Sequence, residues 1–162
     1  MAASCIRCPM ATPAVDVVPT HWSHLRLIAA GMREQDRAEA LAIGMAPERA
    51  LWRSYTLSMF AHTCFVDGKA AAVFGLVTNL LDDVGAPWLA TTPEIERVKL
   101  SFVRYARAEV GLMLTVRPRL VNFVDARYDR AQRFLEAIGF TLDAPAPYGP
   151  NGEMFRRFER CA

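Results

Sequence analysis

The stretch Leu120–Phe140 reads LVNFVDARYDRAQRFLEAIGF, and its pattern decides the fold. The apolar run from Leu120 to Val124 is typical of a strand that is covered on both faces. Asp125 and Asp129 each stand where a short carboxylate can accept hydrogen bonds from the first turn of a helix. The segment therefore predicts a buried strand followed directly by a helix.

The second half of the same stretch has the periodicity of an amphipathic helix. The apolar positions that recur at helical spacing are Ala131, Phe134, Leu135 and Ile138. The basic positions on the opposite side are Arg127, Arg130 and Arg133. Gly139 suits the left-handed conformation that commonly ends a helix, so a second strand is expected from Phe140.

Length and composition indicate one globular domain. The chain has 162 residues, of which 52% are hydrophobic, and its net charge is only +2. This is enough sequence for a substantial core, and the small charge does not indicate nucleic-acid binding. No apolar run approaches the roughly 20 residues needed to span a membrane. We expect an irregular N-terminal arm over residues 1–13 and a single domain over residues 14–162.

The remaining elements follow from local patterns. We expect strands at residues 14–18, 62–66, 69–77, 86–90 and 153–159, and helices at residues 20–30, 33–43, 47–59 and 92–117. The two strands at residues 62–77 flank Asp67-Gly68, a dipeptide suited to the positive φ angles of a type I′ turn. That pair is the clearest hairpin in the sequence.

This order of elements, with two local sequences, resembles the GNAT superfamily of acetyl-CoA-dependent N-acetyltransferases. FVDGKAAAVFGLV at residues 65–77 is similar to the central hairpin of that family, and AQRFLEAIGF at residues 131–140 is similar to its fourth helix and following strand. The resemblance implies an α/β (α+β) fold with a mixed, mostly antiparallel sheet flanked by helices on both faces.

A closer resemblance is to the GNAT-like internal virion proteins of short-tailed phages. It lies in GAPWLATT at residues 85–92, RLVNFVDAR at residues 119–127 and PYGPNGEMFRRFE at residues 147–159. It implies a virion-associated, internal or ejection-apparatus protein that contacts other virion proteins or copies of itself, with assembly in the host cytoplasm. Because aromatic residues and arginines dominate interfaces, the candidate contact residues are Trp88, Tyr148, Arg156 and Arg157.

The cofactor site implied by the GNAT resemblance is altered in this sequence. GNAT enzymes hold the pyrophosphate of acetyl-CoA on a glycine-rich turn before the long helix, where free backbone N–H groups point at the phosphates. Here the segment Thr91–Glu96 contains no glycine, and Pro93 removes one donor. Glu94 and Glu96 add negative charge. We therefore expect no cofactor, and if acetyl-CoA does bind, Thr91 and Thr92 are the candidate donors.

The implied proton donor is also absent. GNAT enzymes commonly place a tyrosine four residues after the alanine that corresponds to Ala131, and this chain has Leu135 there. Tyr128 and Tyr148 are candidate substitutes. Asp83 is a candidate general base, together with its neighbour and His62, although Asp-rich segments before glycine are commonly turns.

A Cys/His pattern near the N-terminus approaches the spacing of a zinc site. It consists of Cys5, Cys8, His21 and His24. The two histidines are separated by two residues rather than three to five, and the spacer contains three prolines. No metal is expected, and these residues are the only candidates if one binds.

Three functions are consistent with these observations. The first is a virion protein that retains a degenerate acetyltransferase fold and acts through protein contacts. The alternative is an acetyl-CoA-dependent N-acetyltransferase with a divergent cofactor site. The third is a binding module directed at a host protein.

Overall fold

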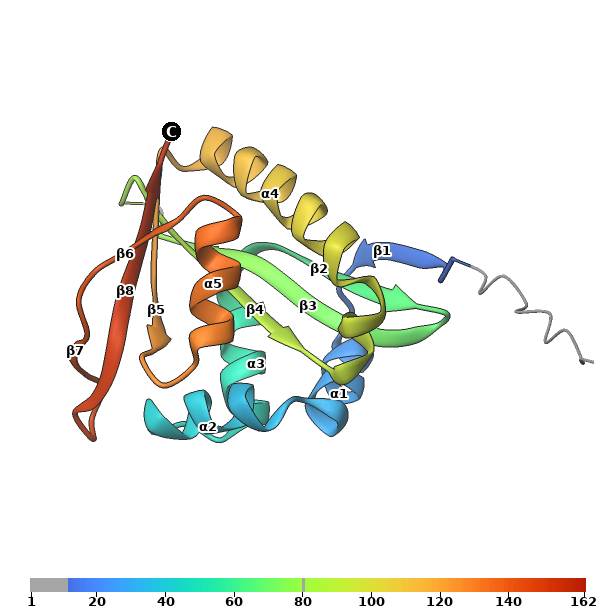
Figure 1. Ribbon diagram of the computed structural model, residues 1–162, viewed down its shortest axis with the longest axis horizontal. Helices are drawn as coiled ribbons and strands as arrows, with labels where there is room; N and C mark the ends of the chain where they lie inside the picture. The colour runs from blue at the N-terminus through green and yellow to red at the C-terminus, as the bar shows by residue number, and fades with distance from the viewer. Residues whose placement is uncertain (1–11, 80) are drawn as a thin grey trace, which may run out of the picture.

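The computed structural model describes residues 12–79 and 81–162, and an eight-stranded sheet forms its centre (Figure 1). The strand order is β1-β2-β3-β4-β5-β8-β6, and β7 pairs with β8. Every pairing is antiparallel except that of β4 with β5. The strands are β1 Val15–Pro19, β2 Ser58–Val66, β3 Lys69–Thr78, β4 Val84–Thr91, β5 Arg119–Asp125, β6 Thr141–Leu142, β7 Ala146–Tyr148 and β8 Glu153–Cys161.

Helices lie on both faces of this sheet (Figure 1). Helices α1 and α3 pack on one face, α2 packs beside α3, and α4 and α5 cover the other face. The helices are α1 Trp22–Gly31, α2 Glu34–Ala42, α3 Pro47–Leu57, the 3-10 helix η1 Pro93–Val98, α4 Lys99–Val116 and α5 Asp129–Ala137. The predicted fold class, an α/β sheet that is mostly antiparallel and flanked by helices, is confirmed.

The decisive stretch folds as its pattern predicts, apart from the helix cap. Gly139 has a φ of 99°, which is the left-handed conformation expected at the end of α5. The residue that precedes α5 is Tyr128, and no side chain caps the helix. Asp125 instead accepts the backbone N–H of Arg127 at 2.9 Å, so its carboxylate closes a local turn before the helix begins.

The structure also tests the predicted hairpin, the long helix and the shorter elements. Asp67 and Gly68 have φ angles of 47° and 75°, which confirms the tight hairpin between β2 and β3. The predicted long helix begins as η1 and continues as α4. The strand expected from Phe140 is present as the short β6, whereas β7 was not predicted, because its three residues have no periodic pattern of their own. The predicted arm over residues 1–13 lies outside the described residues except for its last two.

The core is divided between the two faces of the sheet. One cluster joins α4 and α5 to the sheet through buried residues that include Leu76, Val110, Leu120 and Phe158. A second cluster joins α1 and α3 to the other face through Leu25, Ile28, Leu51 and Val73. Among the described residues, no helix has the length and apolar character that crossing a bilayer requires.

Leu76→Ala should destabilise the fold strongly, because Leu76 has no exposed surface in the middle of β3. We expect a loss of about 2–5 kcal/mol in the free energy of unfolding, measured by urea denaturation. Leu112→Ala is the matched control, since Leu112 lies on α4 with 58% of its surface exposed. Equal losses in the two variants would contradict the placement of β3 in the core.

Candidate functional site

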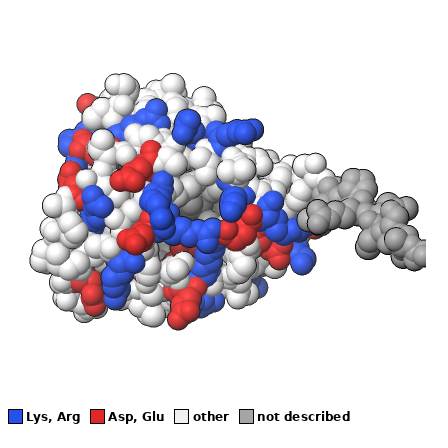
Figure 2. All heavy atoms as spheres, in the orientation of Figure 1, with Lys and Arg blue, Asp and Glu red and all other residues white. Residues whose placement is uncertain are grey.

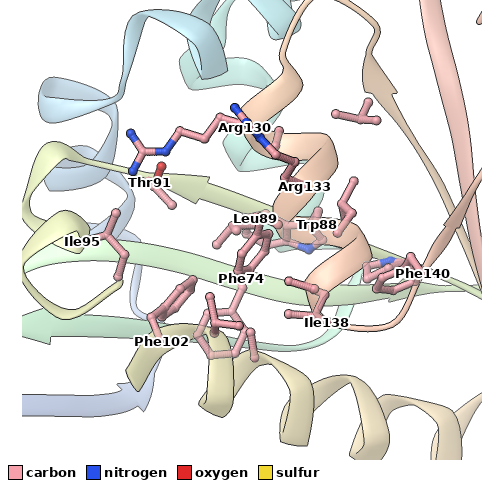
Figure 3. Close-up of a pocket in the computed structure, with 18 of the residues that line it drawn as sticks. Phe74, Trp88, Leu89, Thr91, Ile95, Phe102, Arg130, Arg133, Ile138 and Phe140 are labelled. Carbon is pink, nitrogen blue, oxygen red and sulfur yellow. The ribbon is translucent and has the colours of Figure 1, made fainter. Parts of the chain in front are cut away.

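A cavity lies where β4 and β5 separate. The two strands pair only at Val84 with Arg119 and at Gly85 with Leu120, and they diverge beyond that point (Figure 1). The cavity in the gap has a volume of about 490 Å³ and is walled by residues of α4 and α5. Figure 3 shows apolar side chains directed into it, including Phe74, Phe102 and Ile138.

The backbone of Leu89 faces this gap. In an antiparallel pair, alternate residues bond to the partner strand and the residues between them point away. The N–H of Thr91 turns away from β3 and donates to Asp36 Oδ2 at 2.9 Å. The carbonyl of Pro87 accepts Asn122 Nδ2 from β5 at 2.8 Å. Since Leu89 lies between these two positions, its N–H and C=O also point toward β5.

The wall of the cavity is mostly apolar, and its acidic and phenolic residues are Asp36, Glu39, Glu96, Tyr105, Glu109 and Tyr128. Leu135, the position where the GNAT resemblance implies a tyrosine, lies in this wall and packs against the core. Tyr105 and Tyr128 line the same cavity. Burial raises the pKa of both phenols, helped by Glu109 for Tyr105 and by Asp125 for Tyr128, so both hydroxyl groups are neutral near pH 7.

Basic side chains gather at the mouth of the cavity. Figure 2 shows Lys and Arg around a hollow on this face of the molecule. The basic residues that line the cavity are Arg33, Lys99, Arg130 and Arg133. They come from the α1–α2 connection, from the start of α4 and from α5. Together they form a positively charged rim, and the interior below it is mostly apolar.

One carboxylate lies within this basic rim. Glu96 of η1 forms ion pairs with both Arg33 and Arg130. Although partial burial favours its neutral form, these two arginines hold the pKa of Glu96 below its usual value. Glu94 does not line the cavity and instead pairs with Lys69 and Arg97. Of the two acidic residues in the segment where the resemblance implies phosphate binding, only Glu96 lines the cavity.

The threonines predicted to hold a pyrophosphate are both buried and engaged within the fold. Thr91 donates its N–H and its hydroxyl to Asp36 Oδ2, at 2.9 and 3.0 Å. Thr92 donates its N–H to Ala71 and its hydroxyl to Ala70, at 2.9 and 2.8 Å. Phosphates at this mouth would therefore meet side-chain cations rather than a cradle of backbone N–H groups.

A second cavity of about 190 Å³ lies on the face of the sheet that α1 and α3 cover. It includes Tyr148, whose ring stacks on Phe123 with centroids 3.9 Å apart. The residues that line both cavities are Asp36, Glu39, Trp88, Leu89, Asn122 and Phe123. The gap between β4 and β5 is therefore the place where the two cavities meet.

Glu39 is the residue at this junction that the sequence did not single out. It lies on α2 and is partly buried. Burial, followed by the charges of Asp36 and Asp125, raises the pKa of Glu39 from 4.5 to about 8. A carboxyl group with such a pKa exchanges protons near neutral pH, as general acids and bases do. In the sequence, Glu39 reads only as one of several charged residues on a surface helix.

The two acidic neighbours of Glu39, Asp36 and Asp125, are stabilised by different hydrogen-bond donors. Burial raises the pKa of Asp36, while the two donors of Thr91 oppose that rise. Asp125 is fully buried, and burial alone would raise its pKa. Hydrogen bonds from Arg127, one of them 2.6 Å long, outweigh burial and hold the pKa of Asp125 below its usual value. Among the described residues, no salt bridge joins Glu39 to a cation.

The other predicted residues lie in several places. Trp88 lines both cavities and donates to Ser58 Oγ at 2.7 Å. Asp83 is exposed on the turn before β4 and lines neither cavity, so it is not placed to act as a base there. The two arginines predicted as contact residues bond within the chain. Arg156 donates to Asp143, Gln132 and Leu142, and Arg157 pairs with Asp143 and Glu159.

The predicted Cys/His set is described only in part, because Cys5 and Cys8 lie outside the described residues. His21 caps α1 by accepting the N–H of Ser23, and the His21 N–H donates to His24 Nδ1 at 3.2 Å. Both histidines therefore have a structural role at the start of α1. Over residues 12–79 and 81–162, no group of metal-ligating side chains comes together.

Comparisons with solved structures show which fold this is. The structure matches a spermidine N-acetyltransferase chimera from Vibrio cholerae with a TM-score of 0.64 at 12% identity, over 91% of this chain and 95% of that one. It matches the ribosomal-protein-S18-alanine N-acetyltransferase of Escherichia coli with a TM-score of 0.64 at 14% identity, over 91% and 94%. An acetyltransferase of the GNAT family from Bacillus anthracis matches with a TM-score of 0.66 at 8% identity, over 91% and 94%.

The chain therefore has the fold of GNAT acetyltransferases, as the resemblance implied. No family model matches the sequence, and a search of curated proteins finds no match either. At such low identity the likeness is one of fold. The chemistry of the site must be argued from the residues of this chain.

Glu39→Gln should change how stability depends on pH. Between pH 4.5 and about 8 the folded chain holds a proton on Glu39 that the unfolded chain releases. Stability of the unmodified chain therefore falls as the pH rises through this window. Glutamine does not titrate. The melting temperature of Glu39→Gln, relative to that of the unmodified chain, should therefore rise from pH 5 to pH 8.

Thermal melts at several pH values measure this difference. Glu136→Gln, which removes an exposed carboxylate of α5, is the control. A constant difference between Glu39→Gln and the unmodified chain across the window would show that Glu39 titrates normally.

Proposed function

We propose that this chain is an acyl-coenzyme A-dependent N-acyltransferase with a divergent cofactor site. The observation that carries the proposal is the cavity between β4 and β5, which combines an apolar interior, the open backbone of Leu89 and a basic rim. The shared fold supports the same class of function without selecting a substrate. Acetyl-CoA is the expected acyl donor.

The residues of the cavity fit such a cofactor. The N–H and C=O of Leu89 are available to hold the amide groups of an extended pantetheine arm, as a strand edge holds a peptide. Arg33, Lys99, Arg130 and Arg133 would hold the phosphates, because guanidinium groups bind phosphate oxygens strongly. When bound, the cofactor supplies an acyl group activated as a thioester.

The chain itself would contribute proton donors and a dry environment. Tyr105 and Tyr128 line the cavity with protonated hydroxyl groups and would be the candidate proton donors, whereas Leu135 has no proton to give. Burial raises the pKa of both phenols and makes them weak acids, so hydrogen bonding to the reacting group would be their first contribution. The apolar side chains of α4 and α5 that line the cavity would keep water from the thioester. Exclusion of water strengthens the hydrogen bonds and charges that remain inside the cavity.

Calorimetric titration with acetyl-CoA tests this proposal. We expect micromolar binding with one site per chain. The double variant Arg130→Ala, Arg133→Ala should weaken the affinity at least tenfold, because a hydrogen bond to a charged group contributes roughly 1.5–3 kcal/mol. Arg53→Ala, on the exposed side of α3, is the control and should bind like the unmodified chain. Absence of binding to the unmodified chain would refute the proposal.

A second candidate is a virion protein that retains the fold without the chemistry. Two observations favour it: Glu96 occupies Arg33 and Arg130 at the mouth, and Leu135 stands at the position of the missing acid. Such a protein would act through contacts with other virion proteins, with copies of itself or with a host protein. Deletion of its gene from a phage should then change particle composition or infectivity, and normal particles would exclude this role.

Glu96→Gln distinguishes the two candidates. If the rim holds phosphates, removal of the Glu96 charge frees Arg33 and Arg130, and the affinity for acetyl-CoA should rise several-fold. The rim is open to solvent, so the gain stays well below the roughly 4 kcal/mol expected for a like-charge contact at 4 Å and a dielectric of 20. No binding in either form would favour the non-catalytic candidate.

A further inference from the structure

Helices α1 and α3 cover the face of the sheet opposite α4 and α5, and their outer sides are rich in large apolar residues (Figure 1). The residues concerned, each with 41–54% of its surface exposed, are Trp22, Leu27, Trp52 and Leu57. Leu25 and Leu51 fill the core on the inner sides of the same helices. Large apolar side chains that gather on an exposed face commonly mark a binding surface.

Contacts within the chain place the two tryptophans on one surface. The ring of Trp52 packs edge-on against Tyr55, with centroids 6.2 Å apart. The Tyr55 hydroxyl donates to the carbonyl of Thr20 at 3.2 Å, and Thr20 comes two residues before Trp22. Helices α1 and α3 also pack against each other. Trp52 therefore lies close to the start of α1, where Trp22 is exposed.

The same outer sides have unbalanced positive charge. They contain Arg26, Arg49 and Arg53, all exposed, and the Arg26 Cζ lies 4.6 Å from the centroid of the Trp22 ring. In the part of the chain that the structure describes, none of these three arginines forms a salt bridge. Over residues 22–31 and 47–57 the one acidic residue is Glu48, which lies 3.9 Å from Arg37.

We propose that this outer face of α1 and α3 docks on an anionic lipid surface. Tryptophan favours the boundary between water and hydrocarbon, because its ring is apolar and its N–H is polar. An arginine can place its guanidinium among lipid phosphates while its stem covers apolar surface. Helices that lie flat on a membrane combine an apolar side, aromatic rings and basic residues in this way.

Other partners match the face less well. A nucleic acid would meet the exposed Leu27 and Leu57 with its phosphates, and the net charge of the whole chain is only +2. A second copy related by two-fold symmetry would bring the same arginines together, and like charges repel. The proposal is independent of the proposed function, because none of the seven side chains of this face lines either cavity.

Co-sedimentation with lipid vesicles, without acetyl-CoA, tests the proposal. The probes are vesicles of phosphatidylcholine alone and of phosphatidylcholine with about 30% phosphatidylserine. We expect at least tenfold tighter binding to the anionic vesicles, and added salt should weaken it. The double variant Arg26→Ala, Arg49→Ala should bind these vesicles at least tenfold more weakly, because each basic side chain near such a surface contributes about fivefold.

A matched control removes the same charge from the opposite face. Arg104→Ala, Arg107→Ala, on the exposed side of α4, should bind vesicles like the unmodified chain. Thermal melts of both double variants confirm that they are folded.

Tryptophan fluorescence identifies the face that meets the lipid. Anionic vesicles should shift the emission of the unmodified chain to shorter wavelength, because Trp22 and Trp52 leave water. The double variant Trp22→Phe, Trp52→Phe retains only Trp88 and should lose this shift while it still binds.

Several outcomes would overturn the inference: no binding to anionic vesicles, equal binding to neutral ones, equal losses in the two arginine variants, or an emission shift that persists in the Phe variant. Binding of an RNA homopolymer in place of vesicles would assign the face to nucleic acid instead. A dimer in sedimentation that blocks vesicle binding would assign it to a second copy. Vesicle binding without acetyl-CoA binding would support this inference and refute the proposed function, and the reverse pattern would leave only the proposed function standing.

Discussion

The separation of β4 and β5 is the constraint on which the site depends. Gly85 lies at the last point where the strands pair, and a Cβ atom there would come within 2.7 Å of Leu76 and 3.2 Å of Leu120. Glycine therefore allows the strands to meet at this end. Each strand keeps its other neighbour, β3 or β8, so both remain fixed while the gap between them opens. An open strand edge inside a protein needs polar partners, and the cavity leaves space beside this edge.

Charge is arranged around this gap in two layers. At the outer mouth, cations outnumber the one carboxylate of Glu96, which holds Arg33 and Arg130 in place. At the inner junction, the acidic groups Asp36, Glu39 and Asp125 lie near one another, and two of them are balanced within the chain.

This chain shares the fold of acetyltransferases with few of their residues. The backbone superimposes on acetyltransferases over nearly its whole length, although few residues are shared. Where the resemblance implies a glycine-rich turn, this chain has a proline-containing 3-10 helix, and the donors of Thr91 and Thr92 bond to Asp36 of α2 and to Ala70 of β3.

Local sequence determined the elements that depend on neighbouring residues. The strand, helix and Gly139 of Leu120–Phe140, and the hairpin at Asp67-Gly68, follow from periodicity and from the φ angles that glycine permits. A helix cap at Asp125 was wrong, because the carboxylate found a nearer partner in Arg127. The sheet topology was predicted from the resemblance to the GNAT superfamily, because local sequence patterns do not specify which strands pair.

Only the tertiary structure decided what those elements bring together. Glu39 of α2 lines both cavities together with residues of β4 and β5. Nothing in the sequence of its own helix distinguishes it from other acidic surface residues. Arg156 and Arg157, which are predicted contact residues, also bond to Asp143 in the loop between β6 and β7, and the sequence gives no sign of these bonds. The environment of a side chain is set by residues distant in sequence. Burial, partners and proton affinity therefore appear only once the chain is packed.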